Sequence, residues 1–196
     1  MNLTIVIPTK NRFDYVKKII NYYEHHNFKG KIYFLDSSDK NIFIKTKNCI
    51  KKNGNKNFYH FRRIGTPFEC GKSIAGKIKT KYMCWSGDDD YFVISGLEQS
   101  IKILNKQRKI NALNGKTITA NINSKFLFFR KYSIYDNFYS EQKKPIERLC
   151  KILNEYRVPF WCVFRSEVFK KTMKYVPSKS KRNLCPTRII NDELLE

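Results

Sequence analysis

The fold is decided by the stretch Lys81-Tyr82-Met83-Cys84-Trp85-Ser86-Gly87-Asp88-Asp89-Asp90, in which a short apolar run leads into three consecutive carboxylates. The apolar run has the length and composition of a buried strand. Adjacent carboxylates repel one another, so a fold that gathers them normally offsets the repulsion with a cation or uses it to hold one. At the carboxyl end of a strand, a hard divalent metal would lie where open α/β sheets bind ligands, and it could bridge to the phosphates of a nucleotide. An acidic surface turn is the simpler alternative.

Strand and helix patterns alternate along the N-terminal half of the chain. Short β-branched or aromatic runs alternate with segments whose apolar residues recur at helical spacing. This alternation predicts a parallel α/β sheet wound in right-handed crossovers. The predicted strands cover 3–7, 32–35, 57–62 and 81–85, and the predicted helices cover 13–26, 41–51, 72–79 and 96–107. Asn11 is expected to cap the first helix in a capping-box-like arrangement with Asp14.

The second half has a less regular pattern. A hairpin is expected over 117–122 and 125–132, a helix over 145–156 and a buried strand over 160–164. With 196 residues and 41% hydrophobic content, the chain can bury one sizeable core. We therefore expect a single domain over 1–196.

Composition sets broad limits on the class of protein. The six cysteines form no C-x-x-C pair, which favours a reduced, intracellular protein, and the N-terminus has no signal-peptide pattern. We expect it in the cytoplasm, with peripheral contact at the membrane face left open. The net charge of +22 suits nucleic acid, an anionic membrane or a phosphate-bearing substrate, but it also fits the amino-acid usage of an AT-rich genome. Charge alone therefore assigns no function.

Five motifs occur in the order and spacing of a known family. The motifs are Ile5-Val6-Ile7-Pro8-Thr9-Lys10-Asn11-Arg12, Leu35-Asp36-Ser37-Ser38-Asp39, Thr80 through Tyr91, Phe160 through Glu167, and Asn191-Asp192-Glu193-Leu194-Leu195. With these motifs the sequence resembles a family 2 glycosyltransferase of the GT-A fold over nearly its whole length. The resemblance implies a mostly parallel central sheet flanked by helices. It also implies a nucleotide-sugar-binding half over 1–95 and an acceptor-side half over 96–196, which we expect to be truncated at its C-terminus.

The activity that the resemblance implies is metal-dependent sugar transfer. The donor would be a nucleoside-diphosphate sugar, of UDP type, and the acceptor a hydroxyl on a glycan, a lipid-linked molecule or a protein, with inversion at the anomeric carbon. Asp89 and Asp90 would hold Mg²⁺ or Mn²⁺, and Asp88 would lie near the ribose. Gly87 stands where the family has its first aspartate, so which two of the three carboxylates act stays open.

Donor-binding residues can be carried over from the same resemblance. The loop after the first strand would cradle the nucleoside through Pro8, Thr9, Asn11 and Arg12. Asp36 matches the position that hydrogen-bonds a uracil-type base, although an aspartate that closes a strand is often only a turn former. Lys72 would reach the diphosphate from a helix start, but a surface lysine fits equally well. Gly71-Lys72-Ser73 ends like a P-loop, which Thr66 and Pro67 rule out.

The catalytic base in this family is a carboxylate before a C-terminal helix. It takes the proton of the acceptor hydroxyl as that hydroxyl attacks the sugar. Asp192 matches the second acid of the family's pair, Asn191 replaces the first, and Glu193 is the reserve. The simpler alternative is that both acids are first-turn helix residues that interact favourably with the helix dipole.

Two other classes of function remain. One is an inactive GT-A-like domain that binds nucleotide without turnover. The other is a basic nucleic-acid-binding or metal-nuclease-like protein, since acidic clusters also hold metals that cut phosphodiesters. No DNA- or RNA-binding module is recognisable, so a nucleic-acid partner is not expected. The three histidines, His25, His26 and His60, have no cysteine at zinc spacing near them and predict no zinc site.

Overall fold

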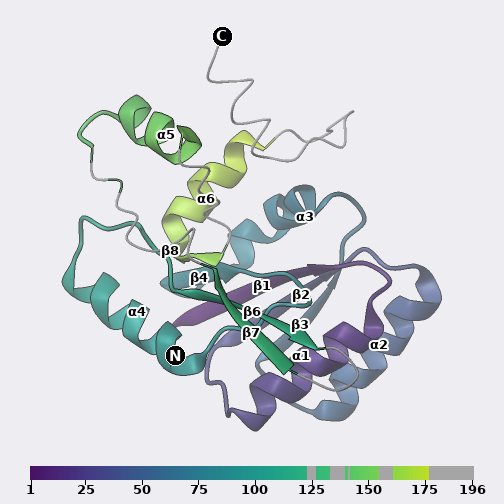
Figure 1. Ribbon diagram of the computed structural model, residues 1–196. Helices are drawn as coiled ribbons and strands as arrows, with labels where there is room; N and C mark the ends of the chain where they lie inside the picture. The colour runs from purple at the N-terminus through teal and green to yellow at the C-terminus, as the bar shows by residue number, and fades with distance from the viewer. Residues whose placement is uncertain (123–126, 133–139, 141, 155–160, 177–196) are drawn as a thin grey trace.

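The computed structural model describes residues 1–122, 127–132, 140, 142–154 and 161–176 (Figure 1). Its centre is a six-stranded sheet in the order β3-β2-β1-β4-β8-β5. The first four strands along the chain, β1 (Leu3–Thr9), β2 (Lys31–Asp36), β3 (Phe58–Arg62) and β4 (Tyr82–Trp85), pair in parallel. The mostly parallel sheet flanked by helices, expected from the alternating pattern, is confirmed.

The second half of the chain adds two strands to this sheet. β8 (Val163–Arg165) pairs antiparallel with β4, and β5 (Ala112–Leu113) pairs antiparallel with β8. The predicted strand over 160–164 thus exists at 163–165, with residue 160 outside the described residues. One sheet contains strands from both predicted halves, so residues near position 161 are brought beside the end of β4.

Helices cover both faces of the sheet. On one face lie α1 (Phe13–His25), α2 (Lys40–Asn53) and α4 (Ile94–Lys106). On the other lie α3 (Pro67–Ile74), the short 3₁₀ helix η1 (Ala75–Lys77) and α6 (Ser166–Tyr175). Both faces are apolar because the inner strands must bury side chains on both sides, which explains their near-continuous hydrophobic runs. Sequence reasoning did not predict α6.

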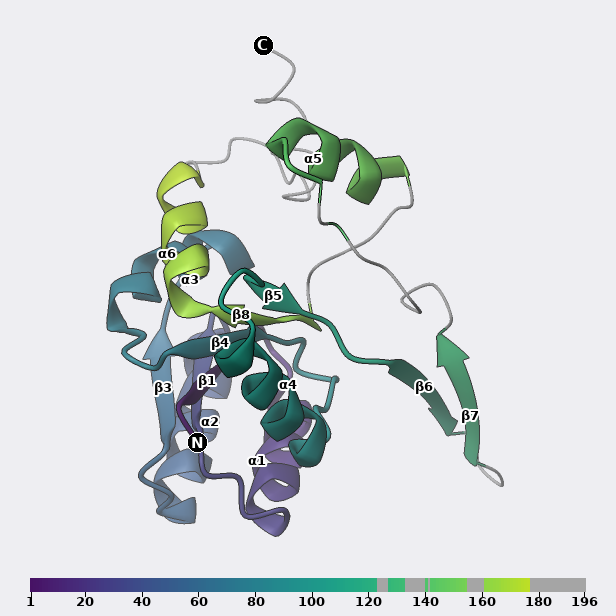
Figure 2. The same cartoon turned by 90° about the vertical axis from the view of Figure 1, so that its left-hand side faces the viewer.

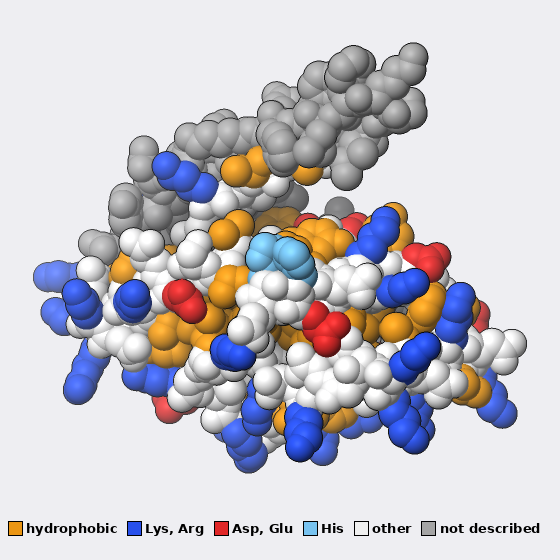
Figure 3. Space-filling view, turned by 90° about the horizontal axis from the view of Figure 1, so that it is seen from below, with side chains coloured by type: hydrophobic (Ala, Val, Ile, Leu, Met, Phe, Trp, Pro, Cys, Tyr) orange, Lys and Arg blue, Asp and Glu red, His pale blue; other side chains and the backbone are white. Residues whose placement is uncertain are grey.

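A hairpin and a helix extend from this core. β6 (Thr117–Ile122) and β7 (Leu127–Tyr132) form the antiparallel hairpin that the sequence predicted, and it projects away from the sheet (Figure 2). α5 (Pro145–Asn154) stands apart from the sheet and has no fully buried residue. No helix within the described residues has the length and apolar character needed to cross a bilayer. Figure 3 shows Lys and Arg side chains spread over one face of the molecule, not gathered in a stripe.

One predicted helix start and one predicted helix cap are wrong, although α1 starts at Phe13 as predicted. α3 begins at Pro67 and not at Lys72, because Thr66 closes a full capping box with Glu69. The cap of α1 is Arg12 and not Asn11, and the Arg12 side chain makes no capping hydrogen bond. Asn11 has a positive φ of 57° and instead bonds across to the loop after β2, so it cannot cap the helix.

Candidate functional site

The candidate site lies where β1 and β4 end side by side. The two strands are hydrogen-bonded neighbours up to the pair Val6↔Trp85, and β1 continues to Thr9 while the chain after β4 turns into the aspartates. Thr9 Oγ1 donates a hydrogen bond of 2.6 Å to Oδ2 of Asp88. Asp88 is only 4% exposed. The first carboxylate of the triplet is therefore a buried group tied to the end of the neighbouring strand.

Arg12 joins two of the three carboxylates. Its Nη1 lies 2.9 Å from Oδ1 of Asp88, and its Nη2 donates a 2.9 Å hydrogen bond to Oδ2 of Asp89. The guanidinium carbon lies 3.9 Å from the centre of the Tyr15 ring, a cation–π contact that orients the guanidinium plane. The fork geometry of arginine suits this bridging of two separate carboxylates.

The surroundings raise the pKa of both Asp88 and Arg12. Burial and the neighbouring charge of Asp89 raise the pKa of Asp88, although Thr9 and Arg12 favour its ionised form. Burial lowers the pKa of Arg12, but hydrogen bonds and the charges of Asp88 and Asp89 outweigh burial and raise it. Arg12 thus supplies the positive charge that offsets repulsion between the first two aspartates.

Asp89 and Asp90 converge over Gly87. A Cβ at Gly87 would lie 2.6 Å from Oδ2 of Asp90 and 2.9 Å from Oδ1 of Asp89, both closer than real contacts allow. The Gly87 amide also donates to Oδ2 of Asp90 at 3.2 Å. The same oxygen accepts a 2.8 Å bond from Nε1 of Trp161. Glycine at this position is therefore explained by space: any larger residue would separate the two carboxylates.

This arrangement fits the divalent metal that the fold family implies. No group of three or more His, Cys, Asp or Glu side chains within the described residues is placed to enclose a metal. Mg²⁺ in nucleotide sites, however, typically takes only one or two protein carboxylates and completes its shell with phosphate and water. The carboxylates of Asp89 and Asp90, which approach each other above Gly87, are the residues that would hold such an ion.

The loop after β2 is bonded to the loop after β1. Ser38 Oγ accepts a 2.7 Å bond from the Asn11 amide. The Asn11 side chain donates to Oδ2 of Asp39 at 3.0 Å and accepts from the Asp39 amide at 2.9 Å. Asp36 sits beneath this junction, fully buried, with Oδ1 accepting from the Ser38 amide at 2.8 Å. Hydrogen bonds thus link the two loops at this edge of the sheet.

Sequence reasoning missed the group that surrounds Asp36. Oδ2 of Asp36 lies 2.8 Å from Nε2 of His60, and since a carboxylate only accepts, Nε2 donates. Burial would raise the pKa of Asp36, but the hydrogen bonds from His60 and Ser38 outweigh burial and lower it. His60 also stacks on Phe43, with ring centroids 4.5 Å apart, and Arg62 lies over the same ring. The only signal in the sequence was the parallel alignment of β2 and β3.

The structure places the predicted site residues unevenly. It brings together Thr9, Arg12 and the three aspartates, with Asn11 and Asp36 in the adjoining loops. Lys72 lies elsewhere: it is in the last turn of α3, against the other face of the sheet, and its amine donates to the backbone carbonyl of Val176. Asp192 and Glu193 are outside the described residues.

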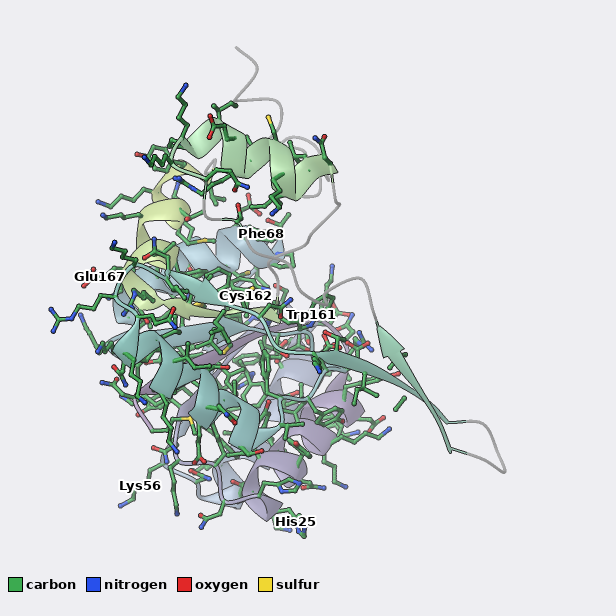
Figure 4. The ribbon with its side chains drawn as sticks, turned by 60° about the vertical axis from the view of Figure 1, so that its left-hand side comes forward. His25, Lys56, Phe68, Trp161, Cys162 and Glu167 are labelled. Atoms are coloured by element: carbon green, nitrogen blue, oxygen red, sulfur yellow. The ribbon has the colours of Figure 1, made fainter. Side chains whose placement is uncertain are left out.

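Two more residues of the predicted motifs lie in or next to strands: Pro8 is in β1, and Trp161 lies just before β8. Pro8 precedes Thr9 in β1 and pairs with Leu35 of β2, so it lies inside the strand and not in the loop. Figure 4 shows Trp161 and Cys162 far from His25 and Lys56, which mark the amino ends of β2 and β3. Its hydrogen bond to Asp90 places Trp161 at the site, whereas the sequence included it only as a member of the acceptor-half motif, with no role of its own.

The sheet order, the flanking helices and the carboxylates after β4 define a GT-A-like α/β fold. Among solved structures, residues 1–349 of TarS from S. aureus are 15% identical with a TM-score of 0.57, over 93% of this chain and 52% of that one. The longer TarS structure is 13% identical with a TM-score of 0.60, over 93% of this chain and 32% of that one. The mannosyltransferase PcManGT from Pyrobaculum calidifontis, in complex with GDP-Man and Mn²⁺, is 11% identical with a TM-score of 0.56, over 87% of this chain and 46% of that one.

These similarities concern the fold. No protein-family model matches the sequence, and no curated protein matches it either. This chain spans about half or less of the length of the solved structures it resembles. The GT-A-like architecture is therefore established, whereas the reaction, donor and acceptor are matters for proposal.

Proposed function

We propose that this chain binds a nucleoside-diphosphate sugar and transfers the sugar to a hydroxyl acceptor, as a metal-dependent glycosyltransferase. The observation that carries the proposal is the convergence of Asp89 and Asp90 over Gly87, beside a buried Asp88, at the carboxyl end of β4. Open α/β sheets bind ligands at this edge. The fold similarity to TarS and PcManGT supports the same reading, because both share this architecture.

Most of the described candidate residues have a proposed part in donor binding. Thr9 at the end of β1, and the loop after it with Asn11 and Arg12, would face the nucleoside and the diphosphate, with Pro8 directing the exit of this loop from the sheet. Asp36 would act through Ser38, whose amide it fixes, and a UDP-type base would lie over that loop. Mg²⁺ or Mn²⁺ bound to Asp89 and Asp90 would supply positive charge that stabilises the leaving diphosphate.

The acceptor side of the proposal rests on the sequence alone. Asp192, with Glu193 as the reserve, would accept the proton of the acceptor hydroxyl, while that hydroxyl attacks the anomeric carbon from the face opposite the diphosphate. Inversion, the cytoplasmic location and peripheral contact with an anionic membrane belong to the proposal in the same way. The net charge of +22 is compatible with an anionic donor and an anionic surface, but it does not select them.

A thermal-shift panel tests the proposal. UDP and a set of nucleotide sugars would be added with and without Mn²⁺ to the wild type, to Asp89→Ala and to Glu98→Ala, an exposed carboxylate on α4 that serves as the control. We expect nucleotide to raise the melting temperature only when Mn²⁺ is present, in the wild type and the control but not in Asp89→Ala. No shift with any nucleotide would refute the proposal.

Turnover separates the enzyme from the alternatives. A glycosyltransferase is expected to release nucleoside diphosphate when an acceptor is present. Asp192→Asn should lose this release while it still binds the donor. Binding without release by the wild type would instead indicate an inactive GT-A-like domain. Salt-sensitive binding of oligonucleotides, without nucleotide-sugar binding, would favour the nuclease-like class.

A further inference from the structure

We propose that Arg12 is an internal cation that holds Asp89 in the nucleotide-free protein and releases it when metal and donor bind. The inference rests on the proposed function and deepens it, by naming a residue that couples metal binding to nucleotide binding. Arg12 bridges Asp88 and Asp89, and Asp89 is also one of the two carboxylates that converge over Gly87. The same carboxylate is thus shared between an arginine and the proposed metal position.

The two arms of the Arg12 bridge differ in environment. The Asp88 side chain is 6% exposed and its second oxygen is held by Thr9, so this partner is anchored. The Asp89 side chain is 51% exposed. Exposed ion pairs shift an equilibrium only roughly 1.5- to 5-fold, because water competes for both charges. The arm to Asp89 is therefore the one that a ligand can displace, while the arm to Asp88 keeps Arg12 in place.

The Asp89 carboxylate cannot bind both the Arg12 guanidinium and a divalent metal ion without weakening one of the two interactions. Its Oδ2 accepts from Nη2 of Arg12, and its Oδ1 lies over Gly87 near Oδ2 of Asp90. A divalent ion at that position would share a carboxylate with a guanidinium, and the two positive charges would repel each other at short range. Asp90 is held independently, by the Gly87 amide and Nε1 of Trp161, so the competition concerns Asp89 alone.

Release of Asp89 would leave Nη2 of Arg12 without its acceptor at the edge of the site. Stacking on Tyr15 and the bond to Asp88 keep the guanidinium plane where it is. A diphosphate oxygen held by the metal is a suitable new acceptor, since guanidinium groups bind phosphate strongly. Metal and nucleotide would then each favour the other's binding, because binding of both together satisfies all the charges.

Titration with Mn²⁺ in the absence of nucleotide tests the competition directly. Free Mn²⁺ would be measured by electron paramagnetic resonance for the wild type, for Arg12→Gln and for Lys10→Gln, which removes the same charge from the same loop. Among the residues described, only Arg12 forms an ion pair with Asp88 or Asp89. We expect Arg12→Gln to bind Mn²⁺ roughly three- to tenfold more tightly than the wild type, and Lys10→Gln to change the affinity less than about twofold.

The opposite results would overturn the proposal. If Arg12→Gln binds Mn²⁺ no more tightly than Lys10→Gln does, Arg12 does not compete for Asp89. Unfolding curves for both variants would accompany the titration, so that weak Mn²⁺ binding caused by misfolded protein is recognised. If Arg12→Gln is misfolded, the titration is repeated with Arg12→Lys. That variant keeps the charge but loses the fork, and we expect its Mn²⁺ affinity to lie between those of the wild type and Arg12→Gln.

A second titration measures the coupling. The Mn²⁺ affinity with and without UDP would be compared in the wild type and in Arg12→Gln. We expect UDP to strengthen Mn²⁺ binding in the wild type, and this enhancement to fall by roughly threefold or more in the variant. An unchanged enhancement would contradict the proposed hand-over to diphosphate. If UDP binds neither protein, the proposed function fails, whereas the nucleotide-free titration still decides whether Arg12 competes with the metal.

Discussion

At the scale of single residues, the buried carboxylate of Asp36 makes the free energy of unfolding depend on pH. Its pKa is lowered by hydrogen bonds from His60 and Ser38, so its contribution to the free energy of unfolding is full above the unfolded-state pKa and is lost as pH falls through the folded-state pKa. We expect Asp36→Asn to destabilise the protein by about 1–3 kcal/mol at neutral pH, because His60 and the Ser38 amide lose an ionised acceptor.

Urea unfolding between neutral pH and about pH 3 measures this effect. The difference in unfolding free energy between the wild type and Asp36→Asn should shrink as the pH falls below about 4, since the protonated aspartate then resembles the amide. Asp39→Asn changes an exposed carboxylate in the same loop and should cost no more than about 0.5 kcal/mol. A difference for Asp36→Asn that stays constant across the pH range would contradict the assigned role.

A substitution at Gly87 is expected to affect metal binding much more than the stability of the fold. An added Cβ would meet the ends of two flexible side chains, Asp89 and Asp90, which can swing aside. We therefore expect Gly87→Ala to change the free energy of unfolding by less than about 1 kcal/mol, but to weaken Mn²⁺ binding roughly tenfold or more, because the ligand pair is spread apart. Gly96→Ala, in α4 with open space around it, is the control and should leave Mn²⁺ binding unchanged. Equal Mn²⁺ affinity in the two variants would show that the convergence over Gly87 is irrelevant to metal.

At the scale of elements, the start of α3 shows what local sequence signals can establish. Thr66 Oγ1 accepts from the Glu69 amide at 3.3 Å, and Glu69 Oε2 accepts from the Thr66 amide at 2.8 Å, with Pro67 in the first helical turn. We expect Thr66→Ala to cost about 1 kcal/mol of stability in urea unfolding, and Thr66→Ser, which keeps the hydroxyl, to cost only a few tenths. If the serine variant loses as much as alanine, the cap hydrogen bond is not the source of the effect.

The elements also show where prediction from sequence succeeds. The parallel strands and the helices of the first half were predicted because strands buried on both faces give continuous apolar runs, and α1 repeats its buried Val16, Ile19, Ile20 and Tyr23 at helical spacing. The helix predicted over 72–79 starts too late because the prediction did not use the capping-box pattern of Thr66-Pro67-Phe68-Glu69, which begins α3 at Pro67. The cap of α1 was misassigned because nothing local shows that Asn11 is held by the loop after β2.

At the scale of the whole molecule, the site depends on contacts between segments far apart in the chain. The aspartate triplet, the loop after β1 and the end of β2 could be predicted to meet, since parallel strands end at one edge. The partners of those residues could not. His60 under Asp36, Arg12 across two aspartates and Trp161 on Asp90 follow from side-chain directions and strand order, which no local pattern specifies.

Trp161 tests whether the second half of the chain completes the proposed metal site. It lies just before β8 and donates from Nε1 to Oδ2 of Asp90, 71 residues away in sequence. Trp161→Phe keeps an aromatic ring but removes the donor, so that, of the two hydrogen bonds described for Asp90, the one from the Gly87 amide would remain. We expect Mn²⁺ affinity to fall roughly threefold to tenfold, in line with the net contribution of one ordinary hydrogen bond. Phe164→Leu, on β8 itself, controls for a general loosening of this strand. If it weakens Mn²⁺ binding as much as Trp161→Phe does, the second half supports the site only through the sheet, and the indole hydrogen bond has no separate part in placing Asp90.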